Sequence, residues 1–207
     1  MAIQREQVVA AALKLLDEKG IEGLSLRRLA QDLAIQAPSL YWHFASKQAV
    51  IEAVANALLE DVARDVPPDL DWRATCVRVS DELRQALRSR RDGARVLAAA
   101  YVVADNVLRP GEAMIAALVR AGADIEFAAT SAFSVFHYVL GLVTVEQSLG
   151  GDEAGSYGTA FEIAAQGDFP HVLQARAVLM SGDFDSLFSS GLSLMLDGIA
   201  LRLSQAT

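Results

Sequence analysis

Residues 39–43 carry a high density of hydrogen-bonding and aromatic side chains on one short segment. Ser39, Tyr41 and His43 can each donate a hydrogen bond to a phosphate oxygen or to a base edge. Trp42 adds an indole N–H and a flat apolar face. A soluble helix seldom exposes two aromatic rings and an imidazole without a partner. The segment therefore indicates contact with a nucleic acid.

The surrounding sequence predicts the helices that would hold this segment in place. Two short helices are expected over 26–33 and 38–44, and the three-residue break between them gives the pair the dimensions of a helix-turn-helix. Leu40 and Phe44 lie four residues apart, so both can face inward onto the first helix. Alternatively, the aromatic run is a helix-end cluster packed against the next helix, an arrangement that fits Phe44 best.

Charge is divided unevenly along the chain. The 207 residues carry a formal net charge of −8. Residues 1–50 hold six basic and five acidic residues, a balance of +1, so the remainder carries −9. An acidic body cannot rest against phosphates without repulsion, and DNA contact is therefore expected only at the N-terminal end.

Composition and periodicity predict an all-α protein. Apolar residues make up 53% of the chain, Ala and Leu dominate, and β-branched runs are scarce. Pro67 and Pro68 mark a boundary, because neither can continue a helix. We expect an N-terminal three-helix helix-turn-helix domain at 1–46, a connecting helix in 47–66 and a helical body at 67–207. Helices of the body are expected at about 72–88, 94–105, 112–121, 125–148, 171–180 and 184–204, with a flexible loop over 150–170.

Two stretches of the N-terminal region resemble a known family. The run from Gly20 to Ala30, the run from Ala37 to Phe44, and the following Lys47 resemble the DNA-binding domain of the tetracycline repressor (TetR) family, in the Tyr-Trp-His form of its tetracycline-type members. A weaker likeness continues through 90–96 and 137–141. The resemblance implies an all-α homodimer that binds operator DNA and a small effector.

The resemblance also implies a set of DNA contacts. Phosphate contacts fall to Arg27, Ser39, Tyr41, His43 and Lys47, with Arg28 as an additional contact and Pro38 and Trp42 as apolar contacts in or beside the major groove. Tetracycline-type members carry a base-reading glutamine just before the proline, where this chain has Ala37. The operator is therefore expected to differ from the tetracycline one, with a thymine methyl facing Ala37 and with Gln36 as an alternative base contact.

Residues 127–145 contain no charged side chain, which raises the question of a membrane span. Polar residues within this stretch and the lack of a basic flank favour a buried helix in a bundle. The resemblance implies that helices near 125–148 and 184–204 pack against those of a second copy. The apolar residues expected on the last helix are Leu187, Phe188, Leu192, Leu194, Met195, Ile199 and Leu203.

A ligand pocket enclosed by the middle helices is also implied by the resemblance. Its candidate lining is Leu97, Tyr101, Asn106, Met114, Leu118, His137, Tyr138 and Glu146, which suits a mostly apolar molecule. His137 is equally well interpreted as a core histidine whose imidazole bonds to a backbone carbonyl. Met114 and Leu118 are better interpreted as core residues than as ligand contacts. Tetracycline-type members hold a magnesium–drug chelate with two histidines. One of them corresponds to His137, and at the position of the other this chain has Leu97. We therefore expect no metal and no cofactor.

These features predict a cytoplasmic, ligand-responsive transcriptional repressor. Enzymes are the main alternative class, but the sequence has no Gly-x-Ser-x-Gly, no Gly-rich phosphate loop, no His-Glu-x-x-His and only one cysteine, Cys76. The other alternative is a helical small-molecule-binding protein without specific DNA binding. The N-terminus shows no secretion signal, so a cytoplasmic location is expected.

Overall fold

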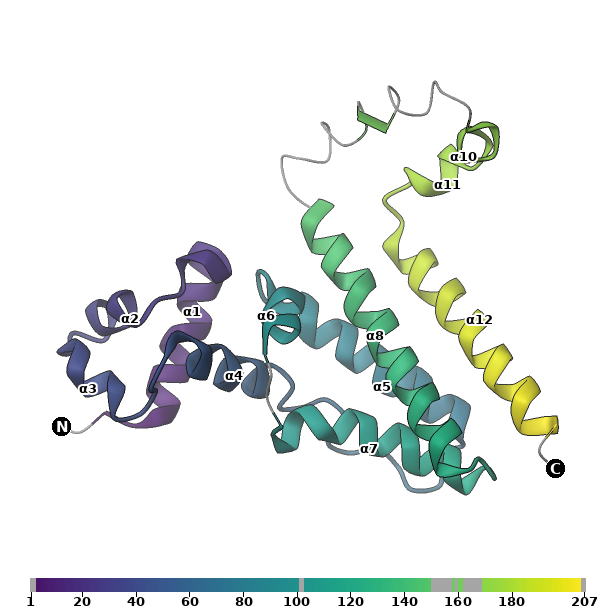
Figure 1. Cartoon of the computed structure of the whole chain (residues 1–207), viewed down its shortest axis with the longest axis horizontal. Coiled ribbons are helices and arrows are strands. Elements are labelled where there is room, and N and C mark those ends of the chain that lie inside the picture. Colours follow the sequence, from purple (N-terminus) through teal and green to yellow (C-terminus); the bar gives the residue numbers. More distant parts are fainter. Residues whose placement is uncertain (1–2, 101–102, 150–157, 159, 162–168, 206–207) are drawn as a thin grey trace.

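The chain folds into a small N-terminal head and a larger helical body (Figure 1). The computed structural model describes residues 3–100, 103–149, 158, 160–161 and 169–205. Within these residues the structure has helices and no strand, which confirms the all-α prediction. The helices are α1 (Arg5–Gly23), α2 (Leu26–Asp32), α3 (Ala37–Tyr41), α4 (Lys47–Leu58), α5 (Trp72–Arg88), α6 (Gly93–Ala99), α7 (Asp105–Arg120), α8 (Ile125–Leu149), α10 (Pro170–Gln174), α11 (Arg176–Leu179) and α12 (Phe184–Gln205).

The head consists of α1 to α4 around one apolar core. Ser25 begins α2 by accepting a hydrogen bond from the backbone N–H of Arg28, and Ser46 does the same for α4 through Ala49. The side chains that fill the space between these helices are fully buried, and they include Leu16, Leu29, Leu40, Phe44 and Val54. These caps and this core fix the angle between α2 and α3.

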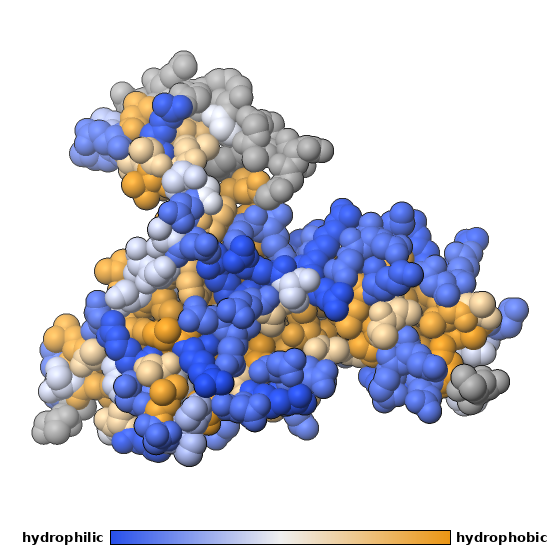
Figure 2. Space-filling model, turned by 180° about the vertical axis from the view of Figure 1, so that it is seen from behind, coloured by the Kyte–Doolittle hydropathy of each residue, from blue (hydrophilic) through white to orange (hydrophobic). Residues whose placement is uncertain are grey.

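The body is built on three mutually packed helices, α5, α7 and α8, with α12 lying along α8 at the edge of the molecule (Figure 1). Its core contains Val79, Leu83, Leu118, Val135 and Val139, all buried. Helix α6 packs against both α4 and α8, so it connects the head to the body. The short helices α10 and α11 bury none of their residues, and Figure 2 shows apolar surface among the polar residues at that end of the molecule.

Several predicted boundaries in the middle of the chain were wrong. The predicted helix 94–105 ends at Ala99, and α7 begins at Asp105 and runs through Pro110, which was expected to precede it. Helix α4 ends at Leu58 and not near residue 64. The predicted helix 171–180 is divided into α10 and α11. Tertiary contacts explain the start of α7, because the backbone N–H of Asn106 donates to the Asn56 side chain and Pro110 is buried.

The predicted loop over 150–170 lies mostly outside the described residues. Helices α8 and α12 are both long and apolar enough to cross a membrane, by length and composition only. In the described structure 33% of the apolar window of α8 and 22% of that of α12 is buried. Both helices therefore carry much apolar surface that the single chain does not cover.

Candidate nucleic-acid interface

Helix α3 presents one buried and one exposed face. Leu40 and Phe44 are buried to 0% and 1% relative exposure, which confirms that they anchor the helix. On the other side Trp42 is 90% exposed and Tyr41 is 57% exposed. Ser39 is exposed as well, and His43 is half-buried. An exposed tryptophan next to a fully buried phenylalanine is a strong sign of a contact surface, because exposure of an indole ring serves no purpose in packing.

Arg5, which the sequence analysis did not single out, holds the end of this helix. Its Nη1 donates a hydrogen bond to the backbone oxygen of His43 at 2.8 Å, and its guanidinium lies 4.2 Å from the centre of the Phe44 ring. His43 and Phe44 both lie at least 38 positions from Arg5 in the sequence, so no local spacing pattern could have indicated these contacts. Arg5 therefore positions the residues that α3 exposes.

Two of the predicted phosphate contacts also bind within the protein. Arg28 donates from Nη1 to the backbone oxygen of Gly23 at 3.1 Å, and Lys47 donates from Nζ to that of Ile21 at 3.2 Å. Both side chains thus tie α2 and α4 to the end of α1 while other N–H groups remain on each. The remaining candidates lie on the outer side of the head: Arg27, Gln36 and Pro38 are exposed, and Ala37 is half-buried.

This geometry agrees with comparison to known proteins. Residues 8–54 match the family described as "Bacterial regulatory proteins, tetR family", and residues 66–203 match "Tetracyclin repressor-like, C-terminal domain". The chain belongs to the TetR family. The tetracycline repressor protein class A from transposon 1721 of Escherichia coli is 35% identical over 202 residues, which are 97% of this chain and 92% of that repressor.

Two solved TetR-family structures are similar over nearly the whole chain. A TetR variant from Acinetobacter baumannii AYE in complex with minocycline has a TM-score of 0.76 at 30% identity, covering 97% of this chain and 98% of that one. BioQ with its double-stranded DNA operator has a TM-score of 0.72 at 33% identity, covering 96% of this chain and 98% of that one. Similarity at this coverage extends to both the head and the body.

In this TetR-family chain one of the contacts between the head and the body is made by the turn between α5 and α6. The Asp92 carboxylate accepts a hydrogen bond from the backbone N–H of Ile21 at 2.9 Å. Arg90 pairs with Asp17 at 2.5 Å, and Arg95 pairs with Glu22 at 2.8 Å, although these pairs are largely exposed. The end of α1 is therefore bound directly to the body, which gives the body a path to the head.

The predicted effector residues that the structure describes lie in different surroundings. Leu97, Met114 and Leu118 are buried in the core, which agrees with the simpler interpretation of the last two. Asn106 binds Asn56, and Tyr101 lies outside the described residues.

The three remaining candidates on α8 have partners within the chain. The Tyr138 hydroxyl bonds to the backbone oxygens of Leu187 and Phe188 at 2.8 and 3.0 Å, and burial raises its pKa. His137 was expected in a buried stretch but is exposed, with Nδ1 2.7 Å from the Phe133 oxygen.

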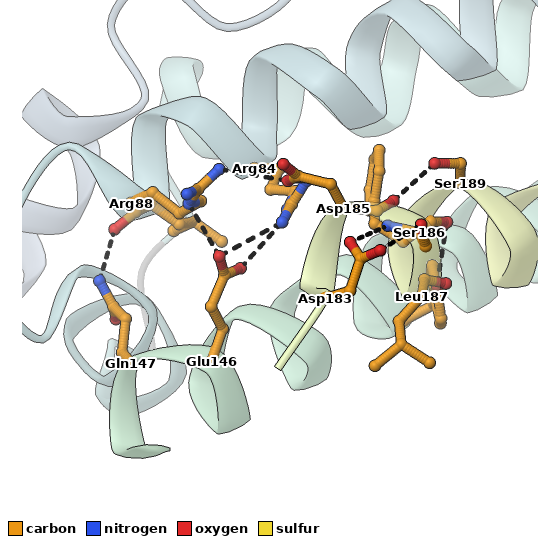
Figure 3. Close-up of polar contacts among 12 residues, drawn as sticks. Arg84, Arg88, Glu146, Gln147, Asp183, Asp185, Ser186, Leu187 and Ser189 are labelled. Carbon is orange, nitrogen blue, oxygen red and sulfur yellow. Dashed lines mark hydrogen bonds and ion pairs between the residues drawn. The ribbon is translucent and has the colours of Figure 1, made fainter. Parts of the chain in front are cut away.

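Glu146 belongs to a network of ion pairs between α5, α8 and α12. Figure 3 shows its carboxylate between Arg84 and Arg88, at 3.2 and 3.0 Å. Asp185, from the first turn of α12, also pairs with Arg84 at 2.7 Å. These pairs join the three helices, and they explain why an acidic residue follows the apolar part of α8.

An apolar groove of about 430 Å³ lies between α7 and α8. This groove was not predicted, because its walls come from two helices whose facing sides become clear only after folding. Its lining consists of Val103, Val107, Leu108, Gly111, Glu112, Ile115, Ala132, Phe133 and Phe136. Among the described residues no three His, Cys, Asp or Glu side chains are grouped as metal ligands.

Exposed apolar side chains mark one further surface, on α8 and α12. Ile125 and Val145 are exposed on α8, and Leu194 and Leu201 are exposed on α12 at 74% and 60%. The prediction for α12 was only partly correct. Three of its expected contact residues, Phe188, Leu192 and Ile199, are buried within the chain itself. The helix thus has one face toward its own body and another that the single chain leaves uncovered.

Proposed function

We propose that this protein is a ligand-responsive repressor that binds a palindromic operator as a homodimer and is released by a small, mostly apolar effector. The observation that carries the proposal is α3, where Trp42 and Tyr41 are exposed beside the buried anchors Leu40 and Phe44. The proposal is also supported by the similar proteins, which include a tetracycline repressor and BioQ bound to its DNA operator. A helix of these dimensions fits the major groove of B-DNA.

Within this proposal the outer face of the head makes the DNA contacts. Arg27, Arg28, Ser39, Tyr41, His43 and Lys47 bind phosphates, and Pro38, Trp42, Ala37 and Gln36 lie toward the bases. Phosphate contacts set orientation and salt dependence, whereas base contacts set sequence preference. Because Ala37 can contact a thymine methyl but cannot read a base by a bidentate hydrogen bond, this position favours an operator unlike that of tetracycline repressors.

The dimer follows from the symmetry that a palindromic operator requires. Two recognition helices must reach half-sites about 34–36 Å apart. Helices α8 and α12 supply the uncovered apolar surface for a second copy. We assign residues 1–46 to DNA binding, 47–66 to the connection and 67–207 to effector binding and dimerisation.

The effector is best accommodated in the groove between α7 and α8. Its volume of about 430 Å³ lies in the range of small-molecule sites, and Glu112 is its one charged lining residue. Binding there would favour one of two positions of the head, and a coupling of about 1–3 kcal/mol would change operator affinity about 5–150-fold. The effector and the operator would then weaken each other's binding reciprocally.

We also propose that the protein is not an enzyme and works in the cytoplasm. The relatives are transcriptional regulators. Burial, with a contribution from Asp71, raises the pKa of the Cys76 thiol to about 12, so this side chain is a poor nucleophile at neutral pH. A repressor must share its compartment with the genome.

Fluorescence anisotropy tests the proposed function. The purified protein is titrated against labelled DNA from upstream of its own gene, and against random DNA, at several salt concentrations. We expect saturable binding by two subunits, in the nanomolar range, steep in salt and at least 1,000-fold tighter than to random DNA. Trp42→Ala should remove this preference. A genome-fragment selection that yields no preferred sequence, with the same weak affinity for every fragment, would contradict the proposal and support a binding protein without operator recognition.

A further inference from the structure

The first turn of α7 forms part of the α7–α8 groove. Val107 and Leu108 line the groove from this turn, opposite Phe133 and Phe136 of α8. Leu108 is 53% exposed and Phe133 is 58% exposed, so the two walls are accessible from solvent. An apolar molecule in the groove would press against the first turn of α7 directly.

The same turn is hydrogen-bonded to the last turn of α4 and to the segment after it, through Asn106 and Arg109. The backbone N–H and the side-chain amide of Asn106 donate to the side-chain and backbone oxygens of Asn56 at 3.2 and 2.9 Å. Arg109 donates from Nη1 to the backbone oxygens of Glu60 and Val62 at 2.8 and 3.4 Å, and from Nη2 to the Asn106 side chain. Glu60 and Val62 lie two and four residues beyond the end of α4, so Arg109 binds the chain that leaves this helix.

Pro110 separates this turn from the rest of α7. A proline has no N–H, so Pro110 cannot donate the helical bond to the Asn106 oxygen. The ring itself is buried, and it therefore stays with the core of the body. Residues 105–109 are joined to the remainder of α7 by fewer hydrogen bonds than a regular turn, which allows them to tilt.

We propose that the first turn of α7 transmits occupancy of the groove to the DNA-binding head. Asn106 and Arg109 are the positioning residues in this scheme. Asn106 binds Asn56 of α4, and Arg109 binds the segment just after α4. At the other end of α4, Lys47 binds the end of α1. The inference rests on the proposed function and adds the route of regulation to it. It is separate from the contacts of Asp92, Arg90 and Arg95, which join the body to α1.

Gly111 allows a test that needs no known effector. It lines the groove, and a Cβ atom built on it meets nothing within 4 Å. Gly111→Trp would therefore place an apolar ring in the groove as a covalent substitute for an effector. We expect Gly111→Trp to lower operator affinity by about 5–150-fold, the usual range of allosteric coupling. Val119→Trp, on an exposed position of the same helix outside the groove lining, is the matched control and should leave operator affinity unchanged.

The decisive comparison repeats this substitution where the contact with α4 is broken. In an Asn106→Ala background, and separately with Arg109→Met, the effect of Gly111→Trp on operator affinity should fall to less than about twofold. If Asn106 and Arg109 served only stability, each would change unfolding and leave the effect of the tryptophan intact. Thermal unfolding and sedimentation of each variant exclude loss of folding or of the dimer.

The possible results separate the two proposals. A wild-type protein that shows no operator preference contradicts the proposed function. Normal operator binding together with a Gly111→Trp effect that is absent, or that persists at full size in both backgrounds, overturns the proposed route through α7. A large effect of Gly111→Trp that both backgrounds abolish supports it.

Discussion

Arg5 shows how a residue outside a helix-turn-helix can determine what it presents. Its guanidinium contacts both the backbone oxygen of His43 and the ring of Phe44. His43 follows the exposed Tyr41 and Trp42, and Phe44 is one of the two buried side chains that anchor α3. The contact spans α1 and the end of α3, so it holds the recognition helix against the first helix of the head. Because the guanidinium is already used within the protein, its main effect on DNA binding is expected to be indirect.

We therefore predict that Arg5→Gln lowers operator affinity about fivefold, corresponding to about 1 kcal/mol for an exposed cation–π contact with one charge-assisted hydrogen bond. Anisotropy titrations at several salt concentrations measure this. The salt slope should stay the same for Arg5→Gln but fall by about 1 for Lys47→Gln, if Lys47 binds a phosphate. Lys14→Gln, another exposed cation on α1, should change neither quantity. A reduced slope with Arg5→Gln would show direct phosphate contact instead.

At the scale of elements, backbone angles and close contacts both constrain the junction of α1 with the α5–α6 turn. Gly20 and Asp92 both have positive backbone φ angles, 68° and 57°. A Cβ atom on Gly20 would lie 2.6 Å from the Asp92 carboxylate that binds Ile21. The glycine is therefore required both by its own backbone angle and by the close approach of the body.

Gly20→Ala is expected to lower the free energy of unfolding by about 1–3 kcal/mol, since it adds strain at a positive φ and displaces Asp92. Urea unfolding at a fixed protein concentration measures the change. Gly111→Ala is the matched control, because this glycine lies within α7 with open space around its Cβ position. That substitution should raise the free energy of unfolding by about 0.5–1 kcal/mol. If both substitutions changed the free energy of unfolding equally, the proposed strain at the junction would be contradicted.

Elements set by local signals were predictable from the sequence, whereas elements set by distant contacts were not. Helix α5 was predicted at about 72–88, and the structure has it at Trp72–Arg88. The apolar residues that recur at helical spacing are a local signal, and so is Asp71, which caps the helix in the structure. The start of α7 was missed, because Asn56 and the buried position of Pro110 act across the fold. Likewise the exposed face of α3 followed from Leu40 and Phe44, whereas Arg5 and the α7–α8 groove depend on contacts between distant segments.

At the scale of the whole molecule, α8 and α12 leave apolar faces uncovered, and these faces are the surface of the proposed dimer. Leu194 and Leu201 on α12, with Val145 on α8, are large apolar side chains at least half exposed. The lateral position of α12, which packs mainly on α8, leaves this surface open (Figure 1). A symmetric dimer would cover the same patch on both copies.

Leu194→Glu should therefore convert the dimer to a monomer, because it would place two carboxylates in an apolar interface. Sedimentation velocity measures the oligomeric state, and operator affinity should fall at the same protein concentrations. Val119→Glu, on an exposed position of α7, serves as the control and should leave the dimer intact. A Leu194→Glu protein that stays dimeric would place the interface elsewhere.

The uncovered apolar face of α12 has a consequence for the amount of this protein in a cell. A subunit that has lost its partner keeps two helices whose apolar windows are only 33% and 22% buried, and such a subunit is a preferred substrate for chaperones and proteases. Association stabilises the folded chain by mass action, so dilution shortens its lifetime and accumulation lengthens it. Turnover would then respond to copy number directly, and a repressor of this design would be removed fastest when it is scarcest.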